Sequence, residues 1–332
     1  SESQDEQERF DKYRYLWCET ENYDLLTDFP QQLDIELSGV CNLKCEHCFQ
    51  NGLLSGKLGH MDVGLFKKLI DEGASHGLCA IKLQVRGESF LHPNWLECCR
   101  YAKAAGIMDI QITTNATLLD DDLGMQILES GLDGIIFSVD DHHEETWQKS
   151  GRAGASYTET ERNIQQFLAL RRRMDASRPW VRIQSAVDVV DNDSVQRTRD
   201  YIKCKFPGAD AILINRIHNF DNECDSYPDL QSSYRLLPCV YLFQRMIVFW
   251  DGSVTACIVD YNNEFALGNA NEQSVKEIWL GPKMQSMRDR HLSGGRVDMD
   301  ICKHCHLSTE GAHWDIDQHA HPLSPRTGAK SV

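Results

Sequence analysis

Short apolar segments alternate with amphipathic segments from residue 33 to residue 217. Six of the apolar segments are rich in β-branched residues and have the length of a buried strand; they span residues 33–40, 80–87, 109–115, 134–140, 180–188 and 211–217. Helical patterns lie between them, and one of these, residues 61–77, places Met61, Leu65, Leu69 and Ile70 on one face. Strands that alternate with helices pair in parallel, so the pattern predicts an α/β fold. That fold is a whole or partial barrel, or an open doubly wound sheet.

The alternation stops near residue 218. Residues 218–233 are rich in turn formers and poor in apolar residues, which is typical of a linker. Residues 246–260 contain two strand-like runs around Asp251-Gly252, a dipeptide that favours a tight hairpin turn. The chain beyond the linker is therefore expected to begin with a β-hairpin.

A helical pattern follows this hairpin over residues 273–292. Gly281-Pro282 interrupts the pattern, because proline lacks the amide hydrogen of a helix interior and clashes with the preceding turn. We expect a kink or a break at this dipeptide.

We expect four parts in the chain. Residues 1–32 show no long hydrophobic period and are expected to form a leader that packs on the main body. The barrel takes residues 33–220, and a small C-terminal domain, a β-hairpin plus a helix, takes residues 221–318. Residues 319–332 have the composition of a disordered tail.

The composition narrows the possible partners. The 332 residues are 41% hydrophobic, which is enough for a sizeable core. The net charge of −16 argues against a surface that follows nucleic-acid phosphates. An acidic surface suits a cationic substrate, and it equally suits simple solubility. Because there is neither a long uncharged apolar run nor a signal peptide pattern, we expect a cytoplasmic protein that does not interact with membranes.

Three cysteines, Cys41, Cys45 and Cys48, follow the first predicted strand and form what we call the three-cysteine loop. Barrels and doubly wound sheets build their sites at the carboxyl ends of strands. Iron–sulfur clusters bind cysteine thiolates, and three thiolates leave one iron of a four-iron cluster open for a small molecule. The alternatives are a zinc site completed by His47 and a chance group of buried thiols.

The pattern C-x-x-x-C-x-x-C, "CNLKCEHC", resembles the signature of the radical S-adenosylmethionine (SAM) superfamily, whose fold is a partial (β/α)6 TIM-like barrel. The resemblance implies a 4Fe-4S cluster whose open iron binds the amino and carboxylate groups of SAM, with His47 inside the cofactor site. It also implies an electron donor of the reduced flavodoxin or ferredoxin type. An electron from the cluster would cleave SAM to a 5'-deoxyadenosyl radical.

Two further stretches resemble motifs of that family. "VRGES" resembles the Gly-Gly-Glu motif that receives the SAM amino group, which implies this role for Gly87 and Glu88. Arg86 replaces the first glycine, so the local backbone shape departs from the family pattern. "TTNATLL" resembles the Thr-Asn-Gly turn after the third strand and implies a role for Asn115. A turn glycine and a helix cap are the ordinary alternatives.

The resemblance extends over the next two motifs. "FSVD" is similar to the family's Ser-x-Asp pattern, which implies that Ser138 and Asp140 face the SAM ribose and carboxylate. "GRAGASYTETERNI" is similar to the segment whose arginine pairs with the SAM carboxylate, which implies Arg152. The bidentate geometry of arginine suits a carboxylate, although a surface arginine would also fit the sequence.

Four more cysteines lie in the C-terminal domain: Cys239, Cys257, Cys302 and Cys305, here called the four-cysteine group. Four thiolates complete a coordination shell, for zinc as well as for an iron–sulfur cluster. Their arrangement resembles the auxiliary-cluster domain called SPASM, in its short form called twitch, because the chain has no cysteine beyond Cys305. The resemblance implies a second 4Fe-4S cluster.

The other cysteines are expected to be small core residues: Cys18, Cys79, Cys98, Cys99, Cys204 and Cys224. Cys224 is an exception, since it lies in a polar loop and could donate a hydrogen atom in an epimerase. His304, His306 and His313 flank the last two cysteines and are expected to be solvated.

A closed second cluster cannot bind a substrate readily, so its expected work is electron transfer, which favours oxidation of a small molecule. Within the family, the auxiliary cysteine spacing is similar to that of the aminocyclitol dehydrogenase of butirosin biosynthesis. We therefore expect oxidation of a secondary alcohol on an aminocyclitol, an aminoglycoside or a related sugar, as in antibiotic biosynthesis. The alternative is a peptide-modifying maturase, either an epimerase or a cross-linking enzyme. A zinc-binding interaction protein without catalysis is the third interpretation.

Overall fold

The computed structural model describes residues 2–46, 48–53, 58–140, 147–148, 155–187, 192–216, 237–303 and 305. Six parallel strands occur where the apolar segments predicted them: β1 Gln32–Ile35, β2 Ala80–Lys82, β3 Asp109–Thr114, β4 Gly134–Ser138, β5 Trp180–Val187 and β6 Ala211–Arg216. The helices between them are α2 Val63–Ser75, α3 Trp95–Ala104, α4 Asp121–Glu129, α6 Tyr157–Arg173 and α7 Asn192–Lys205. Short 3-10 helices add η1 Thr20–Asn22, η2 Phe49–Gly52 and η3 Ser89–Leu91.

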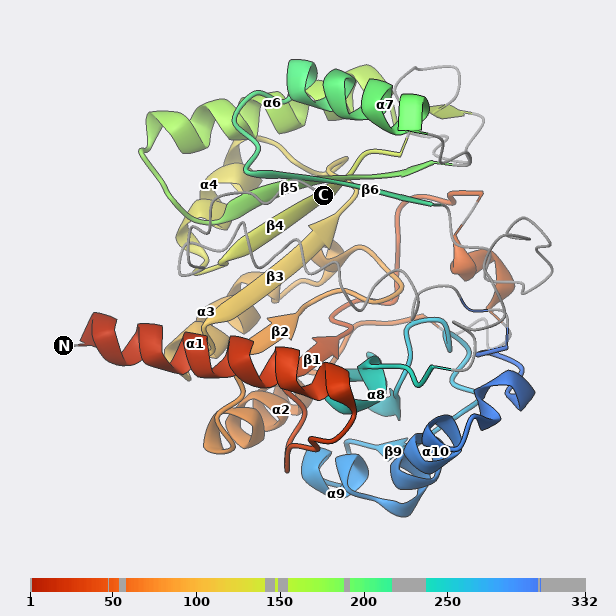
Figure 1. Cartoon of the computed structure of the whole chain (residues 1–332). Helices are drawn as coiled ribbons and strands as arrows, with labels where there is room; N and C mark the ends of the chain where they lie inside the picture. The colour runs from red at the N-terminus through yellow and green to blue at the C-terminus, as the bar shows by residue number, and fades with distance from the viewer. Residues whose placement is uncertain are drawn as a thin grey trace.

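The strands form one sheet in the order β6-β5-β4-β3-β2-β1-β7-β8-β9 (Figure 1). The first six are joined by parallel pairs in sequence order, so the predicted partial α/β barrel is confirmed. β7 Arg245–Val248 also pairs in parallel with β1. It opens the predicted hairpin with β8 Ser253–Thr255, and β9 Gly268–Asn269 follows. The C-terminal domain therefore extends the sheet beyond β1.

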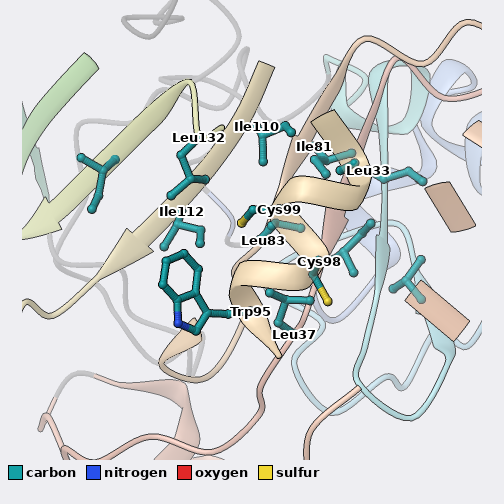
Figure 2. Close-up of a cluster of buried hydrophobic side chains, with 14 of the residues drawn as sticks. Leu33, Leu37, Ile81, Leu83, Trp95, Cys98, Cys99, Ile110, Ile112 and Leu132 are labelled. Carbon is teal, nitrogen blue, oxygen red and sulfur yellow. The ribbon is translucent and has the colours of Figure 1, made fainter. Parts of the chain in front are cut away.

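The main core lies between the strands and their helices. Period-2 alternation turns Leu33, Leu83, Ile110 and Ile112 toward the helices, where they are fully buried. Figure 2 shows Trp95, Cys98 and Cys99 of α3 beside this row of side chains. The helices begin at capping residues, as when Asp62 accepts a hydrogen bond from the amide of Leu65. This packing fixes the strand ends from which the candidate site is built.

The N-terminal segment differs from its prediction. We expected no long period before residue 33, but α1 Glu2–Glu19 is a helix of 18 residues. Its buried side chains, Phe10, Tyr13 and Trp17, recur at helical spacing and pack against Cys79, Ala80 and Met108. Only three aromatic residues carry this face among many charged ones, so the period was too sparse to recognise. Helix α1 lies across the amino ends of the strands (Figure 1).

The C-terminal domain contains three α-helices in its described part: α8 Tyr241–Gln244, α9 Val275–Trp279 and α10 Pro282–Leu292, followed by η5 Gly295–Asp298. The predicted break is confirmed, because Gly281 is the N-cap of α10 and proline occupies its first turn. Ser274 and Glu277 form a capping box at the start of α9. Within the described residues, none of the helices has both the length and the apolarity needed to cross a membrane.

Candidate active site

The three-cysteine loop leaves the end of β1 and is held by its own amide side chains. The Gln50 side chain donates to the carbonyl oxygens of Gly39 (2.9 Å) and Arg86 (2.6 Å). The Asn51 side chain donates to the carbonyl oxygens of Cys45 (2.9 Å) and Glu46 (3.1 Å). These hydrogen bonds satisfy backbone carbonyl oxygens of a loop that has little regular secondary structure. They thereby fix the positions of its thiols.

Gly87 brings a second backbone segment directly against this loop. A Cβ atom at this position would collide with the carbonyl oxygens of Ser38 and Val40. The next residue, Glu88, donates its amide hydrogen to the Val40 carbonyl at 2.8 Å. Only glycine permits this approach, which is a packing reason for the glycine that is independent of any ligand.

Glu88 and Asn115 connect the ends of β2 and β3 to the first cysteine. The buried Glu88 carboxyl accepts the amide hydrogen of Asn115 at 2.9 Å, and burial raises its pKa. The Asn115 side chain donates to Asn42 Oδ1 at 3.0 Å and lies 3.9 Å from Cys41 Sγ. Burial also raises the pKa of Cys41, with smaller effects from Glu88 and Cys45. The structure thus brings Cys41, Glu88 and Asn115 together.

The turn after β3 also departs from the family pattern. Ala116 occupies the position of the glycine in Thr-Asn-Gly, yet it adopts the left-handed conformation with φ 60°. This conformation is strained for a residue with a Cβ atom, and the surrounding hydrogen bonds must offset that strain. The Thr117 amide and hydroxyl both donate to Asn115 Oδ1, at 3.0 and 2.6 Å.

The other predicted SAM contacts divide into two groups. Ser138 ends β4, and Asp140 follows it and accepts the amide hydrogen of Ala186 at 3.0 Å, which ties the end of β4 to β5. His47 and Arg152 lie outside the described residues. Their contacts with SAM, and those of Ser138 and Asp140, therefore stay predictions.

A buried ion pair that no sequence motif predicted joins the segment after β2 to the segment after β1. Arg86 holds Glu36 in a bidentate contact, with Nε–Oε1 at 2.8 Å and Nη2–Oε2 at 2.6 Å, and the side chains are 8% and 0% exposed. Arg86 also donates to the Tyr261 carbonyl at 2.9 Å and lies 3.9 Å above the Phe249 ring. The residue that replaced a family glycine thus links the SAM-motif turn to the C-terminal domain.

The sequence did carry a signal for this contact. Asp34 and Glu36 alternate with apolar residues in a segment that was expected to be buried. Buried carboxylates require partners, and both found arginines, since Arg245 Nη1 lies 3.3 Å from Asp34 Oδ2. Two acidic residues in a buried strand could therefore have predicted two buried arginines.

The four-cysteine group comes together from separate elements. Cys239 precedes α8, Cys257 follows β8, and Cys302 and Cys305 follow η5. Burial, and after it the neighbouring Cys239 and Cys305, raise the pKa of Cys302 to about 12. Cys305 and Cys239 also raise the pKa of Cys257, after burial as the main cause. These mutual effects indicate that the four thiols lie near one another, while their role as ligands stays a prediction.

Two family models match the chain. The model of the radical SAM superfamily matches residues 35–174, which include the three-cysteine loop. The model of an iron-sulfur cluster-binding domain, SPASM, matches residues 239–306, which include the four-cysteine group. The chain contains a radical SAM domain and a SPASM domain.

Several curated proteins are similar to this radical SAM chain. The tungsten-containing aldehyde ferredoxin oxidoreductase cofactor-modifying protein of Pyrococcus furiosus is 25% identical over 76% of this chain and 81% of its own length. The subtilosin biosynthesis protein AlbA of Bacillus subtilis is 25% identical over 78% of this chain and 62% of its own. The 2-deoxy-scyllo-inosamine dehydrogenase of Niallia circulans is 32% identical, but only over 29% of this chain and 36% of its own.

A solved structure agrees with the fold. The structure of BtrN in complex with AdoMet and 2-DOIA superposes with a TM-score of 0.55 at 18% identity, covering 82% of this chain and 91% of BtrN. At this identity, the likeness supports the radical SAM fold and leaves the substrate undetermined.

The SPASM domain holds its ligand segments with buried polar side chains. His291 Nδ1 accepts the amide hydrogen of Cys239 at 3.1 Å, and burial lowers the pKa of His291 to about 4, so the ring is neutral. Arg296 donates to the Leu237 and Cys305 carbonyl oxygens at 3.2 and 2.8 Å. Among the described residues, no three His, Cys, Asp or Glu side chains are placed to hold a single metal ion.

The remaining cysteines follow their predictions in part. Cys79, Cys98 and Cys99 are buried, and burial raises the pKa of Cys98 to about 12, which leaves an unreactive thiol. The prediction was wrong for Cys18 and Cys204, which are exposed on α1 and α7. Both lie on helix faces that point to solvent. Cys224, His304, His306 and His313 lie outside the described residues.

Proposed function

We propose that the three-cysteine loop binds a 4Fe-4S cluster with SAM and that the four-cysteine group binds a second 4Fe-4S cluster. The donor set in each site consists of thiols, which these clusters require. Four thiolates could also bind zinc. The matches to the radical SAM model over residues 35–174 and to the iron-sulfur cluster-binding SPASM model over residues 239–306 favour the clusters.

When bound, these groups supply a 5'-deoxyadenosyl radical at the first site and an electron acceptor at the second. The described residues would position SAM and the cysteine ligands. Gly87 lets the backbone after β2 pass against the loop, where it would face the SAM amino group. Asn115 holds Cys41 through the contact of 3.9 Å, and Glu88 holds the Asn115 backbone. Arg152, Ser138 and Asp140 are proposed to bind the SAM carboxylate and ribose, and His47 is proposed to complete the cofactor site.

The reaction proposed is oxidation of a secondary alcohol to a ketone on an aminocyclitol, an aminoglycoside or a related sugar. The substrate loses one hydrogen atom from carbon, one proton from the hydroxyl group and one electron. The observation that supports this proposal is the match to the SPASM model, whose four cysteines would fill every ligand position of a second cluster and leave none for the substrate. The net charge of −16 suits a cationic sugar. The proposed electron donor is a reduced ferredoxin or flavodoxin, and the proposed location is the cytoplasm. We propose no nucleic-acid or membrane partner.

Anaerobic turnover tests this function. Reduced enzyme is mixed with SAM and 2-deoxy-scyllo-inosamine, the substrate in the name of one relative. We expect 5'-deoxyadenosine and a ketone in equal amounts. The matched control is Cys257→Ala, which should still cleave SAM but produce no ketone. Cleavage of SAM with no change in the oxidation level across a panel of aminocyclitols and aminoglycosides would contradict the proposal.

A peptide maturase is the second candidate, because the match to AlbA spans 78% of this chain, far more than the match to the dehydrogenase. The Cys224→Ala variant separates the two candidates. A radical epimerase that uses this thiol should lose hydrogen return to its product. A dehydrogenase should keep its rate.

A further inference from the structure

Arg296 is buried in the SPASM domain and bonds the backbone at Cys305 and at Leu237, two residues before Cys239. We propose that Arg296 is a positioning residue that holds these ligand segments together and raises the reduction potential of the cluster they bind. This inference rests on the proposed function, in which Cys239, Cys257, Cys302 and Cys305 bind a 4Fe-4S cluster.

The holding role follows from two hydrogen bonds. Arg296 Nη1 donates to the carbonyl oxygen of Leu237, two residues before Cys239, at 3.2 Å. Arg296 Nη2 donates to the carbonyl oxygen of Cys305 at 2.8 Å. One planar side chain therefore connects the segment before α8 to the C-x-x-C knuckle, although these are more than 60 residues apart in sequence.

The charge of Arg296 differs from that of the other buried arginines near β1. Arg86 and Arg245 pair with carboxylates, Glu36 and Asp34. Within the described residues, Arg296 makes no ion pair with a carboxylate, and its contacts are to neutral carbonyl oxygens. Its positive charge is therefore not cancelled by a direct partner.

This charge lies beside the cysteine ligands, because Arg296 Nη2 bonds the carbonyl oxygen of Cys305 itself. The Asp260 carboxyl, three residues after Cys257, is instead bonded to Thr255 and to two backbone amides.

A fixed cation favours the more negative state of a nearby redox group, so it raises the reduction potential. Arg296 would therefore make the second cluster a better electron acceptor than it would be without this charge.

The test uses the full chain with Cys41, Cys45 and Cys48 replaced by alanine, so that one cluster remains. This parent is compared with Arg296→Gln and Arg296→Lys. The matched control is Arg288→Gln, because Arg288 is equally buried and also donates to two carbonyl oxygens, those of Leu242 and Trp279, neither of which belongs to a cysteine. Iron and sulfide are assayed first, and the potential is then measured by redox titration monitored by electron paramagnetic resonance (EPR).

We expect Arg296→Gln to lower the equilibrium constant for one-electron reduction by roughly tenfold, which is 59 mV. Arg296→Lys and Arg288→Gln should stay near the parent value. Equal potentials in the parent and Arg296→Gln, or an equal fall in Arg288→Gln, would overturn the inference.

Iron content separates the remaining outcomes. If Arg296→Gln loses its iron while Arg288→Gln keeps it, the holding role is supported and Arg296→Lys decides the effect of charge. A tenfold fall in the lysine variant would then refute the effect of charge. If the parent itself contains neither iron nor sulfide, the proposed second cluster is wrong, a failure distinct from that of the inference.

Discussion

Uncharged amides fasten the three-cysteine loop, whereas a buried arginine fastens the four-cysteine group. Gln50 and Asn51 bond backbone carbonyls of the loop, and Asn115 reaches Cys41. In the SPASM domain, Arg296 bonds the carbonyl oxygens on either side of the ligand set. Amides fix a backbone without adding charge. An arginine adds a permanent charge, which suits the electron transfer proposed for the second site.

Removal of one thiol from each site should give the largest effects. Cys45→Ala should lower the rate of SAM cleavage by roughly a thousandfold or more, about 4 kcal/mol in barrier, because the first cluster loses a ligand. Cys257→Ala should leave SAM cleavage within about a fewfold of the wild type and abolish product oxidation. The measurement is 5'-deoxyadenosine and ketone formed per minute. Loss of SAM cleavage in both variants would refute the division of labour.

The next effect concerns the ion pair that connects the two regions. Arg86→Met leaves Glu36 buried without its partner, so we expect the free energy of unfolding to fall by about 3–5 kcal/mol. The exposed pair Lys67–Glu97, with N–O at 2.7 Å, is the matched control, and its loss should cost about 0–1 kcal/mol. Denaturant unfolding of the metal-free chains measures both. If Arg86→Met and Glu36→Leu combined are no more stable than Arg86→Met alone, the buried charge is not the cause.

Gly87→Ala should have a smaller effect on stability. The added methyl group meets backbone carbonyls that cannot rotate away, and such overpacking costs about 1–3 kcal/mol. Gly77→Ala is the control, because Gly77 has φ +77° and nothing within 4 Å, so only backbone strain is introduced. We also expect Gly87→Ala to weaken SAM binding, measured by calorimetry on the reconstituted protein. An unchanged affinity would mean that Gly87 serves packing alone.

The sequence predicted the barrel because its strands are continuous β-branched runs, and the C-terminal hairpin because Asp251-Gly252 fits a tight turn. Helix α1 was missed because its packing face consists of Phe10, Tyr13 and Trp17 in an otherwise polar segment. A hydrophobic period cannot predict a helix when only three residues of the segment form its buried face.

The cysteine sites could be proposed from the sequence because thiols at short spacing, as in Cys41–Cys48 and Cys302–Cys305, have few other uses. The contacts that hold them were not. Arg86 meets Glu36 from 50 positions away, and Arg296 meets Leu237 from 59 positions away. Such pairs depend on how the strands are ordered in the sheet, and no local period encodes that order.

The most direct test of the account asks whether the first site has an open metal position. EPR spectra of reduced protein are recorded with and without SAM, in a variant with all four C-terminal cysteines replaced by alanine. We predict one 4Fe-4S signal that shifts when SAM is added, because SAM binds the iron that Cys41, Cys45 and Cys48 leave free. A signal that SAM does not change, or zinc in place of iron and sulfide, would contradict the account.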